Sequence, residues 1–396
     1  MSPAQAGAAA TSHRALAGAR WSLLFGNFAI GCGVMVTAGA LNDISRGLQV
    51  SVALAGQLIT ISAAVMCVGA PLLAGWVAGF DRRRLLAYSL LWFGIGHLLC
   101  ALMPSYAALW PVRAVTVLGA AIFTPQAAAA VGAVAPPAER GRSITFIFLG
   151  WSLASVFGMP MAAWLGDTFD WRIAFSAVAL LSIAGAGWVY AALPDGVRPP
   201  ALSLASWKKV FTDPVLMPMV AVRALMSAGQ FTLFSYFAPY YRDIFGASAT
   251  EVGLMFAWYG AFGVIGNVLL SRYVDRIGPG RAATAAGGVI GFSLLLGPLA
   301  QGIPGVAVGG VPWAFACFAG NSAQQARLGH EAPALAPALM ALNSSAIYLG
   351  QAAGAGSGGW IVAQGGYGPL NWVGLAWIVV GIAVSVWVER HSRRAD

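Results

Sequence analysis

The chain has 396 residues, of which 59% are hydrophobic and 9% are charged, and its formal net charge is +9. A soluble domain carries about 25% charged residues, so this composition excludes an ordinary water-soluble globular protein. It predicts a helical membrane protein instead, because a helix satisfies its backbone hydrogen bonds internally in lipid.

Long apolar stretches follow one another along the chain, and each can hold a membrane helix of about 20 residues. After an N-terminal tail over 1–19, six spans are predicted at 20–42, 52–78, 84–103, 107–134, 142–165 and 172–193. A hydrophilic connection over 194–214 precedes six more at 215–241, 250–271, 281–300, 305–325, 336–362 and 369–388, and a tail over 389–396 follows. We therefore expect an all-α integral membrane protein of twelve transmembrane helices, in two six-helix bundles over 20–193 and 215–388.

The basic residues are distributed unequally between alternate connections. Of the 22 Lys and Arg residues, 17 lie on one side: Arg14, Arg20, Arg82, Arg83, Arg84, Arg140, Arg142, Arg198, Lys208, Lys209, Arg272, Arg276, Arg281, Arg327, Arg390, Arg393 and Arg394. Arg46, Arg172 and Arg242 fall on the other side. The positive-inside rule then predicts a cytoplasmic linker and two cytoplasmic termini. It also explains the positive net charge without nucleic acid as a partner.

Two landmarks recur at a nearly constant offset, which indicates duplication of a six-span unit. Asp81-Arg82 recurs as Asp275-Arg276 after 194 residues, and Ala135-Pro136 recurs as Ala332-Pro333 after 197 residues. Parallel repeats of this kind build transporters whose binding site lies between the halves near the membrane midplane. We therefore expect a pseudo-symmetric pair of bundles.

Two arginines fall inside predicted spans. A charge at mid-membrane costs at least roughly 2.5–3.5 kcal/mol, so Arg113 and Arg223 are expected to face a wet cavity or a partner. Helical spacing places Thr116 on the face of Arg113 and Gln230 on the face of Arg223. Snorkelling to the interface, or a structural bond to backbone carbonyls, is the alternative.

Polar stripes on the tenth and eleventh spans add further candidates for a substrate cavity. Trp313, Cys317, Asn321 and Gln324 share one face of the tenth span, as expected for a wall that binds an organic solute. Tyr348 lies on a polar arc of the eleventh span, and Asn27 is a further candidate in the first span. Helix–helix hydrogen bonding is the alternative for these polar groups.

Small residues indicate close helix packing elsewhere. Gly350, Gly354 and Gly358 recur every four residues, a spacing typical of tight interhelical seams. Gly158 and Pro160 predict a kinked fifth span.

Enzymatic chemistry is poorly supported. The chain has no HExxH motif, nucleophile elbow or phosphate-binding loop. Its four Cys residues show no metal-binding spacing, so no metal or cofactor is expected. A non-transporting receptor or scaffold is the competing class, and it would predict a sizeable soluble domain or a long tail.

The chain resembles the major facilitator superfamily, and more narrowly the twelve-span drug:proton antiporter family in its arabinose-efflux-permease-like branch. That family carries a Gly-x-x-x-Asp-Arg-x-Gly-Arg pattern after spans 2 and 8. The second copy runs from Ser271 to Gly278 with Arg281 beyond, whereas the first, from Gly75 to Arg84, has Gly79 where the acid is expected. Gly150, Gly158 and Pro160 resemble the antiporter motif of span 5, and Arg113 resembles an intramembrane arginine motif.

The resemblance implies a secondary transporter in the inner membrane of a bacterium. It implies export of a small organic solute (sugar-, metabolite- or drug-like) by alternating access, with proton influx as the coupled movement and a monomer in the bilayer. An importer or a facilitative uniporter of the same fold is the alternative. The loops imply gating residues at Asp81, Arg82, Asp275, Arg276, Gly278 and Arg281. Asp43, at the outer end of span 1, is the candidate for proton coupling.

Overall fold

The computed structural model describes residues 3–198 and 203–392, and this part of the chain contains helices and no strand. The N-terminal half comprises α1 (Pro3–Gly39), α2 (Leu41–Leu48), α3 (Val52–Trp76), α4 (Arg82–Leu102), α5 (Tyr106–Thr116), α6 (Leu118–Val134), η1 (Pro137–Glu139), α7 (Arg140–Leu153), η2 (Ala154–Gly158), α8 (Met159–Thr168) and α9 (Trp171–Ala192). Helix α10 (Leu204–Thr212) lies in the linker. The C-terminal half comprises α11 (Leu216–Phe234), α12 (Phe237–Phe245), α13 (Ala249–Ile277), α14 (Pro279–Leu296), η3 (Gly297–Leu299), α15 (Gly302–Gly309), α16 (Val311–Glu331), η4 (Pro333–Leu335), α17 (Ala336–Gly365) and α18 (Leu370–Ser392).

Eleven helical segments of the described chain are long and apolar enough to cross a membrane. They correspond in order to the expected spans, except that the eleventh expected span, α17, is not among them. Helix α17 has 30 residues, but its glycines and polar residues, among them Asn343, Ser344 and Gln351, make it less apolar. It packs along α11 and α3, so protein surrounds much of its length.

Several spans consist of two helices, and proline accounts for two of the breaks. A proline in a helix clashes with the carbonyl four residues earlier. The residue four before Pro239 is Ser235, which lies where α11 ends and α12 follows. The residue four before Pro160 is Val156, which lies inside the π-helical turn η2. The fourth and tenth spans also divide, at Val117 and Gly310. The expected kink of the fifth span is thus a π-turn.

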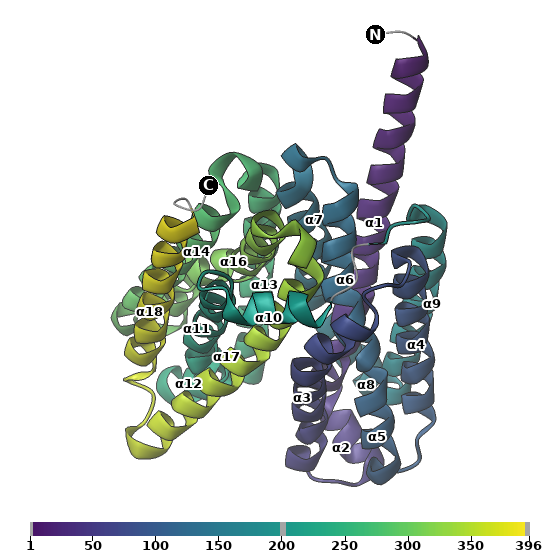
Figure 1. Cartoon of the computed structure of the whole chain (residues 1–396). Coiled ribbons are helices and arrows are strands. Elements are labelled where there is room, and N and C mark those ends of the chain that lie inside the picture. Colours follow the sequence, from purple (N-terminus) through teal and green to yellow (C-terminus); the bar gives the residue numbers. More distant parts are fainter. Residues whose placement is uncertain (1–2, 199–202, 393–396) are drawn as a thin grey trace.

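The helices pack as two bundles, one from each half of the chain (Figure 1). Helices α1, α4, α6, α7 and α9 pack among themselves, as do α11, α13, α14, α16, α17 and α18. The halves meet where α7 packs on α13 and α16, and where α17 packs on α3 and α6. In Figure 1, α10 crosses between the two bundles.

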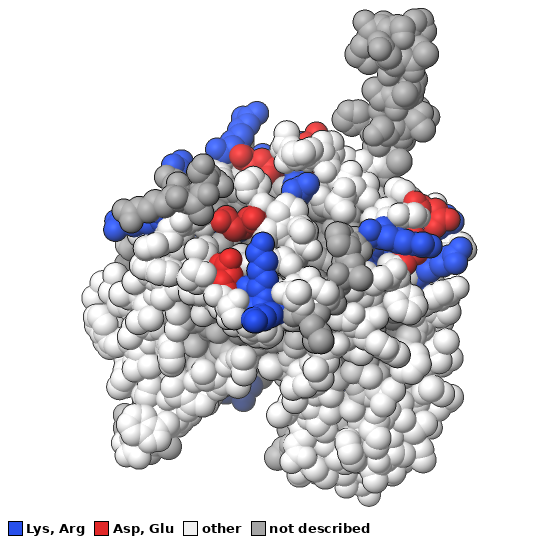
Figure 2. All heavy atoms as spheres, in the orientation of Figure 1, with Lys and Arg blue, Asp and Glu red and all other residues white. Residues whose placement is uncertain are grey.

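The two ends of the molecule differ in charge and in closure. Lys, Arg, Asp and Glu gather at the end where both termini lie, which we call the charged end (Figure 2). At the opposite end, a hollow separates two nearly uncharged lobes (Figure 2). The structure is therefore closed at the charged end and open at the other.

Candidate transport pathway and gates

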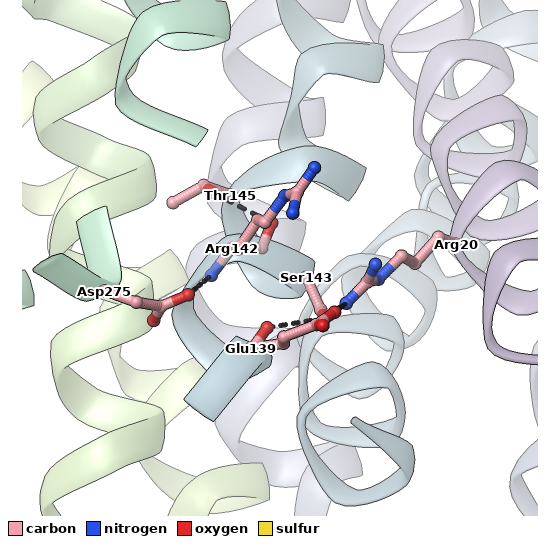
Figure 3. A network of polar contacts seen from close by, with 6 residues as sticks. All are labelled: Arg20, Glu139, Arg142, Ser143, Thr145 and Asp275. Atoms are coloured by element: carbon pink, nitrogen blue, oxygen red, sulfur yellow. Dashed lines mark hydrogen bonds and ion pairs between the residues drawn. The ribbon is translucent and has the colours of Figure 1, made fainter. Parts of the chain in front are cut away.

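At the charged end, Asp275 of α13 joins the two halves (Figure 3). Its carboxylate accepts the backbone N–H of Arg142 at 2.8 Å, at the start of α7. The first N–H groups of a helix lack intrahelical partners and carry partial positive charge, so a carboxylate from the other half satisfies one of them. Gly141 is necessary for this approach, because a Cβ there would lie 2.3 Å from the carboxylate. Sequence reasoning missed Gly141.

A second set of bonds attaches the same turn of α7 to α1 (Figure 3). Arg20 donates to Glu139 at 2.5 Å and to Ser143 at 2.7 and 3.0 Å. The start of α7 is thus bound on one side by α13 and on the other by α1. Arg20 was counted in the sequence only as a topological charge, since nothing in its surroundings marks it as a gate residue.

The first Asp-Arg loop acts inside its own half. Asp81 accepts from the backbone N–H of Arg84, which caps α4, and from that of Gly196 at 2.8 Å. Arg82 is fully buried and donates to the carbonyls of Val77, Ala78 and Phe80. These bonds hold the end of α3 and the segment after α9, so Asp81 and Arg82 do not join the halves in this state.

The rest of the second loop lies within the C-terminal half. Gly278 has a φ of 89°, which favours glycine, and it links α13 directly to α14. Arg281 lies 3.5 Å from Glu389 of α18, and Arg276 is exposed at the end of α13. Among these residues, Asp275 is the one with a described bond across the gate.

Further contacts between the halves are short and involve small or polar side chains. Asn267 of α13 donates to Ser152 of α7 at 3.1 Å, and both are buried. Ser345 of α17 donates to the carbonyl of Cys67 in α3, and Tyr348 donates to Met66 at 3.1 Å. Tyr348 therefore lies at the contact between the halves, on the expected eleventh-span arc.

Arg113 lies inside the N-terminal half, where it makes structural hydrogen bonds instead of lining a cavity between the halves. Its side chain is fully buried and donates to Ser62 at 3.2 Å, to His97 at 2.8 Å and to the Gly33 carbonyl at 2.8 Å. Thr116 bonds to its own helix and packs on Gly96 of α4. Neither residue is presented to the hollow between the halves.

Arg223 has very different surroundings. With Gln230 and Gln324 it lines a small cavity among α11, α14 and α16, whose other walls are Val222, Met226, Ala283, Gly287, Ile290 and Gly320. The Nε of Arg223, the Nε2 of Gln230 and the Oε1 of Gln324 are buried without a hydrogen-bond partner. Unpaired buried polar atoms are costly, so these three atoms favour a polar partner that the small cavity does not supply in this state.

The other cavity candidates divide between an aromatic wall and helix contacts. Trp313 stacks on Phe234 at 5.4 Å and packs on Phe237 and Tyr259 at the end of α16 remote from the charged end. The Oδ1 of Asn321 is buried without a hydrogen-bond partner. Asn27 donates to the Ile147 carbonyl of α7 at 3.1 Å, which is a helix contact.

The glycine positions allow backbones to approach. Added Cβ atoms at Gly350, Gly354 and Gly358 would lie 2.1, 2.3 and 2.6 Å from backbone oxygens of α11. A Cβ at Gly158 would lie 2.5 Å from the Sγ of Cys32 in α1. Pro160 lies in the first turn of α8. The three α17 glycines thus leave room for the backbone of α11 to lie close.

Asp43 is bonded within the N-terminal half. It lies on the short helix α2 and forms an ion pair with Arg46, which also reaches Asp167 at 3.4 Å. Its carboxylate packs where a Cβ of Gly166 in α8 would lie. Asp43 therefore connects α2 to α8, and its geometry gives no support to a coupling role.

The described residues thus form a helical membrane protein of two packed halves, bonded together at one end and separated by a hollow at the other. The solved structure of the human organic anion transporter MFSD10 (TETRAN) has this fold, with a TM-score of 0.75 and 15% identity over 94% of this chain and 99% of that one.

Sequence comparison identifies the family. The sequence model of one protein family, the Major Facilitator Superfamily, matches residues 23–333 and 220–396. The inner membrane transport protein YdhP of Escherichia coli (strain K12) is 31% identical over 374 residues, which are 92% of this chain and 93% of that protein. A probable sugar efflux transporter of Pasteurella multocida is 26% identical over 369 residues, which are 89% of this chain and 88% of that protein. The chain belongs to the Major Facilitator Superfamily.

Proposed function

We propose that this protein exports a small organic solute across the inner membrane of a bacterium in exchange for protons, as a monomer with both termini in the cytoplasm. The observation that carries the proposal is the one-sided closure: the charged end is sealed while the other end is hollow (Figure 2). The positive-inside rule assigns the charged end to the cytoplasm, so this state faces outward. The similarity to a probable sugar efflux transporter of Pasteurella multocida supports export as the direction.

The cavity around Arg223 supports the choice of solute. A guanidinium and an amide donor without partners favour an anionic or hydroxyl-rich group, whereas the aromatic wall at Trp313 and Phe234 favours an apolar part. The charged residue that lines this cavity is an arginine, which disfavours a cationic drug.

The test is a solute screen with purified protein in proteoliposomes, with and without a pH gradient. We expect at least one anionic or hydroxyl-rich solute to accumulate on the side from which protons leave. Solute movement that ignores the gradient would identify a uniporter, and movement in the same direction as protons would identify an importer. A protein that binds but moves no solute would support the receptor alternative.

A further inference from the structure

A single isoleucine packs where the two halves meet at the charged end. Ile144 of α7 is fully buried. Its Cδ1 lies 3.3 Å from the place that a Cβ of Gly132 in α6 would take, and 2.9 Å from the place that a Cβ of Gly329 in α16 would take. The ε-methyl of Met340 in α17, which is also fully buried, lies 3.1 Å from that same place at Gly329. Ile144 therefore fills the space between α6 of its own half and α16 of the other, beside α17.

The two glycines occupy equivalent positions in the two repeats. Gly132 lies three residues before Ala135-Pro136, and Gly329 lies three residues before Ala332-Pro333. A Cβ at Gly329 would lie closer to the Ile144 methyl than the roughly 3.5–4.0 Å at which carbon atoms pack best. The recurring Gly-x-x-Ala-Pro pattern thus leaves a place on each half for the same side chain.

The polar bond between the halves at this end lies outside the apolar contact. Asp275 and Arg142, which form it, are both exposed. Such a bond holds two helices together, but water still reaches its atoms. Ile144 lies two residues further into α7 and is fully buried, so the exclusion of water depends on its contact with the other half.

Amide groups without partners lie on the far side of Ile144. Gln325 precedes Gly329 by four residues and Asn343 follows Met340 by three, so each lies about one helical turn further from the charged end on the same face. Both are buried, and the Oε1 of Gln325 and both amide atoms of Asn343 have no hydrogen-bond partner among the described residues. Water that reached these atoms would satisfy them. The packing of Ile144 therefore keeps water from a place that favours it.

We infer that Ile144 is the seal of the transport pathway at the charged end: its δ-methyl, enclosed between Gly132 and Gly329, keeps water from entering between the halves. Asp275 holds the halves together, and Ile144 makes their contact dry. When this end opens, Ile144 leaves Gly329 and the amides beyond it become hydrated. The inference goes beyond the proposed function, because a dry closed end is needed for any solute and for either direction of transport.

The first experiment measures access of water to a position beyond the seal. Ser322 is buried two helical turns from Gly329 on the same face of α16, and Ser322→Cys changes its size little. In a protein without its four native cysteines, a small charged methanethiosulfonate reagent is added on the charged side. We expect modification at least fivefold faster with Ile144→Ala than without it, because the vacated space adjoins the unpaired amides of Gln325 and Asn343 and fills with water. An unchanged rate would overturn the inference.

The matched control is the same substitution at a buried isoleucine inside one half. Ile378 of α18 is fully buried and packs on Gly229 and Gly291 in the C-terminal half. Ile378→Ala removes the same atoms in apolar surroundings, where cavities stay dry, so its rate of modification should equal that of the unmodified protein. An equal increase in both variants would show that any cavity in the core admits the reagent, and the inference would fail.

A smaller deletion avoids dependence on the folding of Ile144→Ala. Ile144→Val removes Cδ1, the atom of this side chain that lies nearest to the positions at Gly132 and Gly329, and leaves the rest in place. We expect modification at least twofold faster than in the unmodified protein. The same rate in both would refute the role of this methyl.

Conformation separates a leaking seal from a shifted equilibrium. Gly56 of α3 and Gly356 of α17 lie toward the open end in different halves, and a Cβ at either would meet no described atom within 4 Å. Spin labels at Gly56→Cys and Gly356→Cys report the hollow in lipid nanodiscs. With Ile144→Ala, the population with a closed hollow should rise by less than twofold. A rise as large as that of the modification rate would show that Ile144 acts on the equilibrium alone, and would overturn the inference.

None of these measurements needs a solute. If the solute screen finds no transport, the proposed function fails and the labelling rates still judge the seal. If Ile144→Ala admits no reagent while solute moves, the seal fails and the proposed function stands.

Discussion

Asp275 and Asp81 occupy equivalent places in the two repeats, but their bonds differ. Asp275 reaches from α13 to the backbone of α7 in the other half, whereas Asp81 caps α4 and holds the Gly196 N–H in its own half. The same residue type in the same loop therefore closes a gate in one case and stabilises a bundle in the other. The difference at Gly79 was visible in the sequence, but the destination of the Asp81 carboxylate was not.

Asp275→Asn should weaken the closed charged end. A hydrogen bond to a charged group contributes about 1.5–3 kcal/mol and one to a neutral group about 1 kcal/mol, so the ratio of closed to open molecules should fall by roughly twofold or more. Native Cys67, half-buried beside Ser345 at the contact between the halves, provides the readout: its labelling by a maleimide added on the charged side should rise. Asp81→Asn is the control, and an equal rise there would show that the first loop also gates.

Arg113 and Arg223 should respond differently to the same substitution. Arg113→Ala removes the donor that His97 Nε2 and the Gly33 carbonyl share, and loss of a partner at a buried polar group costs about 1–3 kcal/mol, so its melting temperature should fall. Arg223→Ala removes a guanidinium that has no described bond and should keep the melting temperature while transport falls at least tenfold. Thermal unfolding and proteoliposome flux check both variants. Normal transport by Arg223→Ala would remove this residue from the binding site.

At the scale of helices, α11 and α17 lie in close backbone contact over three successive turns. Three glycines of α17 lie against carbonyls of α11, one helical turn apart. Small residues permit such approaches, which van der Waals contacts then stabilise. We expect α11 and α17 to move together when the halves rearrange.

Gly354→Leu should therefore disrupt this pair. A Cβ at Gly354 would already lie 2.3 Å from the Ala228 carbonyl, and overpacking of this kind typically costs about 1–3 kcal/mol. Gly356→Leu, two residues away in open space, is the matched control. Thermal unfolding should show a loss for Gly354→Leu alone; equal melting temperatures would mean that the helices can separate without cost.

The sequence predicted the order of the helices better than their breaks and surroundings. Long apolar runs and basic loops report on the membrane itself, so the span order agrees with the structure. Helix α1 begins at Pro3 instead of after a separate tail, because an Ala-rich stretch continues the helix without a break in composition. The linker contains α10, a short amphipathic segment that carries little hydropathy signal. The partner of Arg113 was unpredictable, since His97 and Gly33 approach it only through packing of α1 and α4 on α5.

At the scale of the molecule, the charge asymmetry of Figure 2 defines one orientation in the membrane. Reporter fusions at residue 205, in α10, and at residue 396 should both be active with a cytoplasmic reporter and silent with a periplasmic one. The physical reason is the retention of Lys and Arg on the cytoplasmic side. A periplasmic signal at either position would contradict the assignment of the charged end to the cytoplasm. It would therefore also contradict the outward-facing state.

The single carboxylate bond between α13 and α7 also has a kinetic meaning. Two equivalent latches would have to break in one concerted event, and the activation barrier to opening would contain both. With Asp275 bonded across the gate and Asp81 committed to its own bundle, the barrier contains one such polar bond, and that bond is solvent-accessible. The rate at which the charged end opens should therefore depend on ionic strength and respond more to substitution of Asp275 than to substitution of Asp81.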